Sequence, residues 1–127
     1  MTALTRATWL ASSTMALLGT ATSQTAAGGS SLQDRFYLMR FVAHRKTFAQ
    51  GMTDDERATM GRHVAYWTAE IRAGSVLLFG PVIDPRESWG FGVLRVASEA
   101  AAHTLIEADP ASALGRHELL LIPRLIQ

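Results

Sequence analysis

The sequence contains no cysteine among its 127 residues and no marked excess of charge of either sign. The first absence excludes disulfide bonds, thiolate nucleophiles and cysteine-ligated metal sites. The formal net charge at pH 7 is only +1, and no basic stripe runs along the chain. A nucleic-acid partner is therefore not expected, because binding to a phosphate backbone requires clustered lysine and arginine.

The first part of the chain lacks both charge and long apolar runs. No charged residue occurs between Ala7 and Gln33, and the apolar stretch that follows Arg6 is interrupted by serine and threonine. This pattern predicts a secretory signal peptide at residues 1–23 and a flexible linker at residues 24–34. The stretch is too short to span a bilayer, so no membrane contact of the mature protein is expected. The protein is then secreted or periplasmic; it is cytoplasmic if the leader is merely disordered.

Residues 35–127 predict one α+β domain. Strand-length apolar runs and amphipathic helical segments alternate in the order βαββαβ, at 36–43, 53–73, 75–82, 91–97, 98–108 and 116–125. This order is that of a ferredoxin-like unit, in which a four-stranded antiparallel sheet carries two helices on one face. The second and third strands are expected to pair as a hairpin.

The first helix has the clearest boundaries. Thr53 and Glu56 have the spacing of a capping box, and Gly74 stands where a left-handed cap ends a helix. The helical spacing predicts a buried stripe made of Met60, Val64, Trp67 and Ile71.

The strands carry two further signals. Pro81 lacks an N–H, so Gly80-Pro81 is expected to end the regular pairing of the second strand. Most strands carry large apolar side chains on both faces, whereas two helices cover only one face of a sheet. The other face therefore predicts a homodimer with the two sheets packed face to face.

Several segments of this domain resemble the YCII-related (YciI-like) domain family. They are TFAQGMTDDERATMGRHVAYW, the Ala73-Gly74 pair, LLFGPV and EADPA. The resemblance implies a dimeric α+β barrel built from ferredoxin-like units, and an active site with one histidine and one aspartate, which fall on His63 and Asp109. It also implies kinship with muconolactone-processing and chloromuconolactone-dehalogenating enzymes.

The residue types at these two positions suit acid–base chemistry. His63 borders the buried stripe, where a half-buried imidazole would transfer protons near neutral pH. The alternative is a side chain at the edge of the core that is hydrogen-bonded to a backbone carbonyl. Asp109 paired with His63 would fix the tautomer of the imidazole. Asp109 before Pro110 is also an ordinary N-cap for a short turn, and the two roles can coexist.

Three further side chains, Arg40, Tyr66 and Trp89, are expected to contact a substrate. Arg40 in a strand interior is either a clamp for a substrate carboxylate or a charge that discourages aggregation. Tyr66 adds aromatic bulk, and Trp89 lines either a pocket mouth or the dimer contact, whereas Trp67 is expected in the core.

No cofactor or metal site is predicted. His44, His103 and His117 show no HxH or HxxxH spacing with each other or with His63. The glycines of Gly90-Phe91-Gly92 open a strand and not a helix, so they do not form a phosphate-binding loop.

These features together favour a small cofactor-free enzyme. His63, oriented by Asp109, would act as general acid and base on a small organic substrate, lactone-like or a cyclic acid, in a pocket between the first helix and the sheet that the 44–52 loop closes. The alternative is a non-catalytic dimeric module that binds a small ligand. A third interpretation is an exported metal- or haem-handling protein with a histidine ligand.

Overall fold

The computed structural model describes residues 33–126, so the predicted signal peptide at 1–23 lies outside the described residues. The βαββαβ order is confirmed, with a short 3₁₀ helix inserted before the last strand. The elements are β1 (Arg35–Ala43), α1 (Asp54–Ala73), β2 (Val76–Val82), β3 (Trp89–Val96), α2 (Glu99–Glu107), η1 (Pro110–Leu114) and β4 (Gly115–Ile122).

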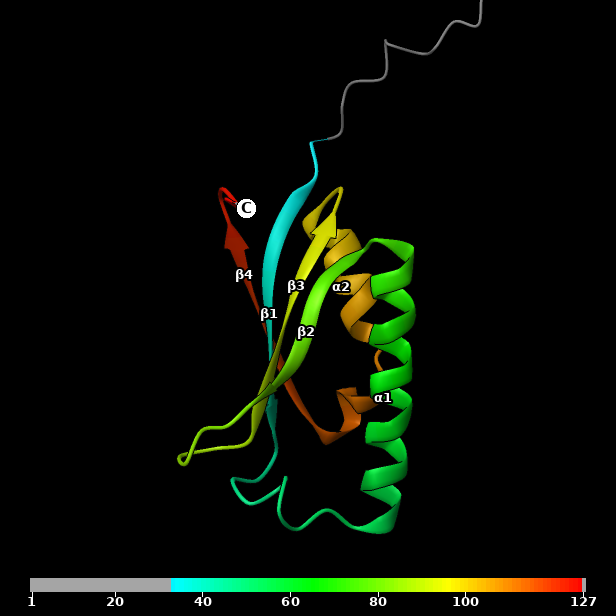
Figure 1. The fold of residues 1–127 in the computed structure, drawn as a ribbon, viewed down its shortest axis with the longest axis vertical. Helices are drawn as coiled ribbons and strands as arrows, with labels where there is room; N and C mark the ends of the chain where they lie inside the picture. Colours follow the sequence, from blue (N-terminus) through cyan, green and yellow to red (C-terminus); the bar gives the residue numbers. More distant parts are fainter. Residues whose placement is uncertain (1–32, 127) are drawn as a thin grey trace, which may run out of the picture. The chain divides into compact units, whose positions relative to one another are not determined.

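The four strands form one antiparallel sheet in the order β2-β3-β1-β4. The strands β2 and β3 pair as a hairpin, as predicted, and β1 lies in the middle between β3 and β4. Figure 1 shows α1 and α2 on the same side of the sheet. We call this side the inner face and the other side the outer face. This arrangement is the predicted ferredoxin-like fold.

The inner face carries the core. On β1 the side chains of Tyr37, Met39 and Phe41 point towards the helices and are almost fully buried. The alternate residues of β1 point to the outer face, as period-two alternation requires. Within residues 33–126, no helix has the length and apolar character needed to cross a membrane.

The first helix begins and ends where its sequence predicts. The Thr53 hydroxyl accepts from the Glu56 N–H, and the Glu56 carboxylate accepts from the Thr53 N–H, which completes the capping box. At the other end Gly74 has φ of 86°, a left-handed conformation that glycine adopts without a steric cost.

The predicted buried stripe of α1 is wrong at two positions. Val64 and Ile71 are 51% and 38% exposed, whereas Trp67 is fully buried and His63 is 8% exposed. The helix is therefore turned so that the row formed by His63 and Trp67 faces the sheet. A buried imidazole is stable there because a carboxylate accepts its N–H, as described below.

The predicted end of pairing at Gly80-Pro81 is also wrong. Pro81 pairs with Gly90, and Val82 still pairs with Trp89. Because β2 is an edge strand, proline is tolerated there: its missing N–H removes no hydrogen bond from the ladder when that position faces the free edge. The irregularity of β2 lies instead near its start, between Val76 and Leu78.

Candidate active site

The structure brings His63 and Asp109 together. His63 projects from the middle of α1, and Asp109 lies in the turn between α2 and η1. The His63 Nδ1–H donates to both carboxylate oxygens, at 2.8 Å to Oδ1 and 2.9 Å to Oδ2. The two residues are 46 positions apart in the chain, so the contact depends on the docking of η1 against α1.

Asp109 accepts three further hydrogen bonds. Its Oδ1 accepts from the Ala111 N–H at 2.9 Å, which makes it the N-cap of η1 with Pro110 next in the chain, as predicted. Its Oδ2 accepts from Trp67 Nε1 at 3.0 Å and from His117 Nε2 at 3.1 Å. Capping and contact with His63 therefore coexist in one carboxylate.

The ionised form of Asp109 is strongly favoured in the folded protein. Its side chain is fully buried, which by itself would raise the pKa. The hydrogen bonds from His117, His63, the Ala111 N–H and Trp67 more than offset that burial, so the pKa of Asp109 lies well below its ordinary value. A fixed negative charge therefore stands behind His63.

The contact with Asp109 defines the tautomer of His63. Because Nδ1 carries the donated proton, Nε2 of the neutral ring holds a lone pair. Nε2 of His63 has no hydrogen-bond partner among the described residues. Every fully buried side-chain nitrogen or oxygen of these residues does have one. Nε2 is therefore not fully buried, and it is open to the cavity that His63 lines. The rings of Phe41 and Phe79 lie with centroids 5.8 Å and 6.3 Å from the imidazole.

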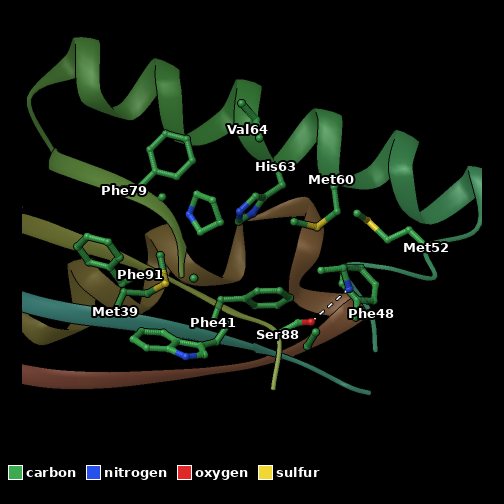
Figure 2. Close-up of a pocket in the computed structure, with 16 residues that line it drawn as sticks. Met39, Phe41, Phe48, Met52, Met60, His63, Val64, Phe79, Ser88 and Phe91 are labelled. Carbon is green, nitrogen blue, oxygen red and sulfur yellow. Dashed lines mark hydrogen bonds between the residues drawn. The ribbon is translucent and has the colours of Figure 1, made fainter. Parts of the chain in front are cut away.

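A cavity of about 210 Å³ lies between the first half of α1 and the sheet. Figure 2 shows His63 and Met60 projecting from α1 towards Phe41, with Phe79 and Phe91 at one end and Phe48 and Ser88 at the other. The lining is mostly aromatic, methionine and backbone, from residues Met39, Phe41, Ala43, Phe48, Ala49, Met52, Met60, His63, Val64, Phe79, Gly80, Pro81, Ser88, Trp89, Gly90 and Phe91.

The segment 44–52 forms one wall of this cavity and is held by Arg45. Its guanidinium donates to both oxygens of Glu56, at 2.6 Å and 2.7 Å, and to the Gly51 carbonyl at 2.7 Å. The bonds from Arg45 and from the Thr53 N–H lower the pKa of Glu56 to about 2. The carboxylate that caps α1 thus also fixes the segment that carries Phe48 into the cavity.

The three predicted substrate contacts lie in different places. Trp89 lines the cavity, and its indole N–H donates to Asp84 at 3.1 Å. Arg40 lies on the outer face, where it contacts Glu87 and Glu118 and stands 4.7 Å from the centroid of the Trp89 ring. Tyr66 does not line the cavity: its hydroxyl donates to the Leu105 carbonyl, and burial raises its pKa to about 12.

Sequence reasoning missed His117. It pairs with Phe41 across β1 and β4, and this register places its imidazole beside Asp109. The only sequence signal is that position 117, like 115 and 119, points to the inner face if β4 starts at Gly115. Trp67 was correctly predicted in the core, but its donation to Asp109 depends on the same docking of η1.

The residues around Asp109 are not arranged as a metal centre. Within residues 33–126, no group of three or more histidine, aspartate or glutamate side chains has the geometry to hold a metal ion. The imidazole nitrogens nearest to Asp109 carry the protons donated to its carboxylate.

Comparison with known proteins identifies the family. The model of the YCII-related domain matches residues 39–124, so the chain belongs to the YCII-related domain family. No curated protein matches the sequence. Among solved structures, the fold is similar to that of 5-chloro-2-hydroxyhydroquinone dehydrochlorinase from Burkholderia phenoliruptrix in complex with 2,5-dihydroxybenzoquinone, with a TM-score of 0.49 and 15% identity, over 70% of this chain and 93% of that one.

Proposed function

We propose that this protein is a small acid–base enzyme in which His63 transfers a proton to or from a small organic substrate. One observation carries the proposal: Asp109 holds Nδ1 of His63 at 2.8 Å while the ring faces a cavity of about 210 Å³. His63 is the catalytic residue, because it is the titratable group in the lining. Asp109 does not line the cavity and acts as a positioning residue.

The chemistry follows from the tautomer. Neutral His63 takes a proton from a substrate atom at Nε2, and the imidazolium that forms is stabilised by the charge of Asp109. The same group then returns the proton to another atom of the substrate or to a leaving group. Isomerisation, lactone rearrangement and elimination all consist of such steps, and the apolar walls strengthen the electrostatic interaction by excluding water.

The test is a turnover screen of lactones and small cyclic ketones and phenols on the wild-type protein. For a substrate that is turned over, His63→Gln should lower kcat by about 10²–10⁴-fold, the usual contribution of a general base. His103→Gln is the matched control, because His103 lies exposed on α2 away from the cavity. Turnover that survives His63→Gln unchanged would remove the proposal.

A non-catalytic module that binds a small ligand is the second candidate. This candidate is favoured by the structural role of Asp109, which caps η1 and accepts a hydrogen bond from Trp67 independently of any catalytic role of His63. In that case a ligand bound in the cavity would be recovered chemically unchanged after any incubation time, and His63→Gln would alter only the Kd of that ligand.

We also propose a homodimer formed through the outer face. Leu78 and Leu120 on this face are 46% and 54% exposed, and Figure 1 shows α1 and α2 on the opposite side of the sheet. The face also carries both signs of charge, with Arg40 beside Glu118 and Arg116, so a two-fold copy can complement it.

Export through residues 1–23 stays a prediction; a mature N-terminus that still begins at Met1 in cells would contradict it.

A further inference from the structure

The polar side chains in the cavity lining are almost all committed to other partners. The Ser88 hydroxyl donates to the Lys46 carbonyl at 3.0 Å and accepts from the Ala49 N–H at 3.2 Å. The Trp89 indole N–H donates to Asp84. Among the lining side chains, Nε2 of His63 is therefore the hydrogen-bonding atom left for a ligand.

Among the described residues, no lysine or arginine lines the cavity, and the guanidinium groups of Arg40 and Arg45 are already paired. Arg40 lies against the Trp89 ring and contacts Glu87 and Glu118, and Arg45 is held by Glu56. Asp109 adds a buried negative charge behind His63. An anionic ligand would lose its hydration in this cavity and find no cation among the described lining residues, which is strongly unfavourable.

The size of the cavity fits one ring. An apolar cavity of about 150 Å³ in another protein accommodates benzene. The space here, about 210 Å³, holds a six-membered ring with one or two small substituents. The walls include the aromatic rings of Phe41 and Phe79, which suit contact with a flat apolar ligand.

Gly90 and Gly92 leave room on the inner face of β3, and Gly90 lines the cavity. Gly90 pairs with Phe41 and Gly92 pairs with Met39, so both stand at positions whose side chains would point to the inner face. A Cβ at Gly90 would lie 3.1 Å from the Gly80 carbonyl oxygen, and a Cβ at Gly92 would lie 3.1 Å from Met39 Cε. Of the two, Gly90 lines the cavity, so a side chain there would press on β2 and take up cavity space, whereas a side chain at Gly92 would press on Met39.

We propose that this cavity selects an uncharged, single-ring organic ligand whose one polar group, a hydroxyl or carbonyl, lies against Nε2 of His63, with Gly90 as the residue that makes room for the ring. The inference names a substrate class for the proposed acid–base function and rests on it for turnover. The binding preference itself requires only the cavity. The carboxylate clamp expected at Arg40 has no place in this ligand class, because Arg40 lies on the outer face.

The experiment compares phenol with benzoate, two probes that share a ring and differ in charge at neutral pH. Titrations of the full chain, followed by NMR, should give a Kd for phenol at least about tenfold lower than for benzoate, and phenol should shift the ring resonances of His63. Equal or tighter binding of benzoate, or phenol binding that leaves His63 unshifted, would overturn the inference.

Two variants test the position of the ligand. Gly90→Val should abolish phenol binding, whereas Gly61→Ala should not change it, because a Cβ at Gly61 meets no atom within 4 Å. If Gly90→Val does not fold, Val64→Phe replaces it, since Val64 is a half-exposed residue of the lining and tolerates a larger side chain. Unchanged phenol binding in the folded filling variant would place the ligand elsewhere and overturn the inference.

A charge-switch variant separates the inference from the proposed function. Val64→Lys supplies a cation at the rim and should improve benzoate binding by about threefold over Val64→Gln, which has similar length without charge. No gain would count against a preference set by charge. The proposed function fails on a different result: phenol-type ligands bind as expected but His63→Gln leaves turnover intact.

Discussion

Nε2 of His117 lies 3.1 Å from Oδ2 of Asp109, so that one buried carboxylate accepts from two imidazole rings. His117 does not line the cavity, and its ring packs against Phe41 with centroids 5.1 Å apart. The second imidazole therefore orients Asp109 and contributes to the site through it.

Replacing His117 should affect stability first. His117→Phe removes a donor to a buried carboxylate and should lower the free energy of unfolding by about 1.5–3 kcal/mol, as for hydrogen bonds to charged groups. His117→Gln keeps an N–H and should lose less. Urea denaturation measures both, with His103→Phe on exposed α2 as the control. An equal loss in the Phe and Gln variants would show that only packing is involved.

The charge of Asp109 should make stability depend on pH. Its folded pKa lies below the ordinary value of 3.8, so the folded state favours the ionised form. Its contribution is therefore full above about pH 5 and is lost as the pH falls through 3.8 towards the folded pKa. Asp109→Asn should destabilise the protein by about 3 kcal/mol near neutral pH, and this difference should shrink in acid. A difference that stays constant down to about pH 3 would contradict this account.

Gly115 is required by its neighbours, not by its backbone angles. A Cβ there would lie 2.2 Å from the Val42 carbonyl oxygen and 2.9 Å from two atoms of the Phe41 ring. Gly115→Ala should therefore cost about 1–3 kcal/mol, as overpacking does, and should move the ring that contacts both imidazoles. Gly61→Ala in α1 is the opposite control and should stabilise the helix by about 0.5–1 kcal/mol. Thermal unfolding measures both variants.

The hold of Arg45 on the 44–52 segment is testable by hydrogen exchange. Arg45→Gln removes the bonds to Glu56 and Gly51, so the amides of this segment should exchange faster and the cavity wall should loosen. Arg57→Gln is the control, because Arg57 makes only an exposed contact with Asp54 at 3.5 Å. Equal exchange in the two variants would mean that the segment is held by the burial of Phe48 alone.

The proposed dimer predicts unequal effects of two neighbouring leucines on β4. Leu120 points to the outer face and Leu121 to the inner face, and both are more than half exposed. Leu120→Glu should shift the protein towards monomer in sedimentation velocity at micromolar concentration, whereas Leu121→Glu should not. A monomeric wild-type protein under these conditions would contradict the proposal.

Local signals made much of the fold predictable. Thr53, Glu56 and Gly74 define α1 through contacts within a few residues of the chain, and the order of elements follows from the alternation of strand-like and helical segments. The face of α1 was not predictable in the same way. Two rows of residues, one with Val64 and one with His63, lie side by side on the helix. Apolar character favoured the row with Val64, which is exposed. The row with His63 is buried because a carboxylate 46 residues away accepts the imidazole N–H, and no local signal shows that contact.

The site was predictable only in part for the same reason. The family resemblance pointed to His63 and Asp109, and their contact in the structure is within hydrogen-bond distance. The contribution of His117 depends on the register between β1 and β4, and the cavity depends on which face Gly90 occupies in β3. The local sequence does not specify the register of either strand pair, and a shift of one residue would exchange the two faces of a strand.

The double duty of Asp109 has a consequence for how this chain can diverge. Because the same carboxylate starts η1 and receives the N–H of Trp67, selection for folding alone preserves it. His63 has no comparable structural duty beyond its contact with that carboxylate and its place in the wall. Under the proposed acid–base function, descendants that abandon the reaction should therefore keep the aspartate and lose the histidine. The histidine, and not the pair, would then distinguish active members from inactive ones.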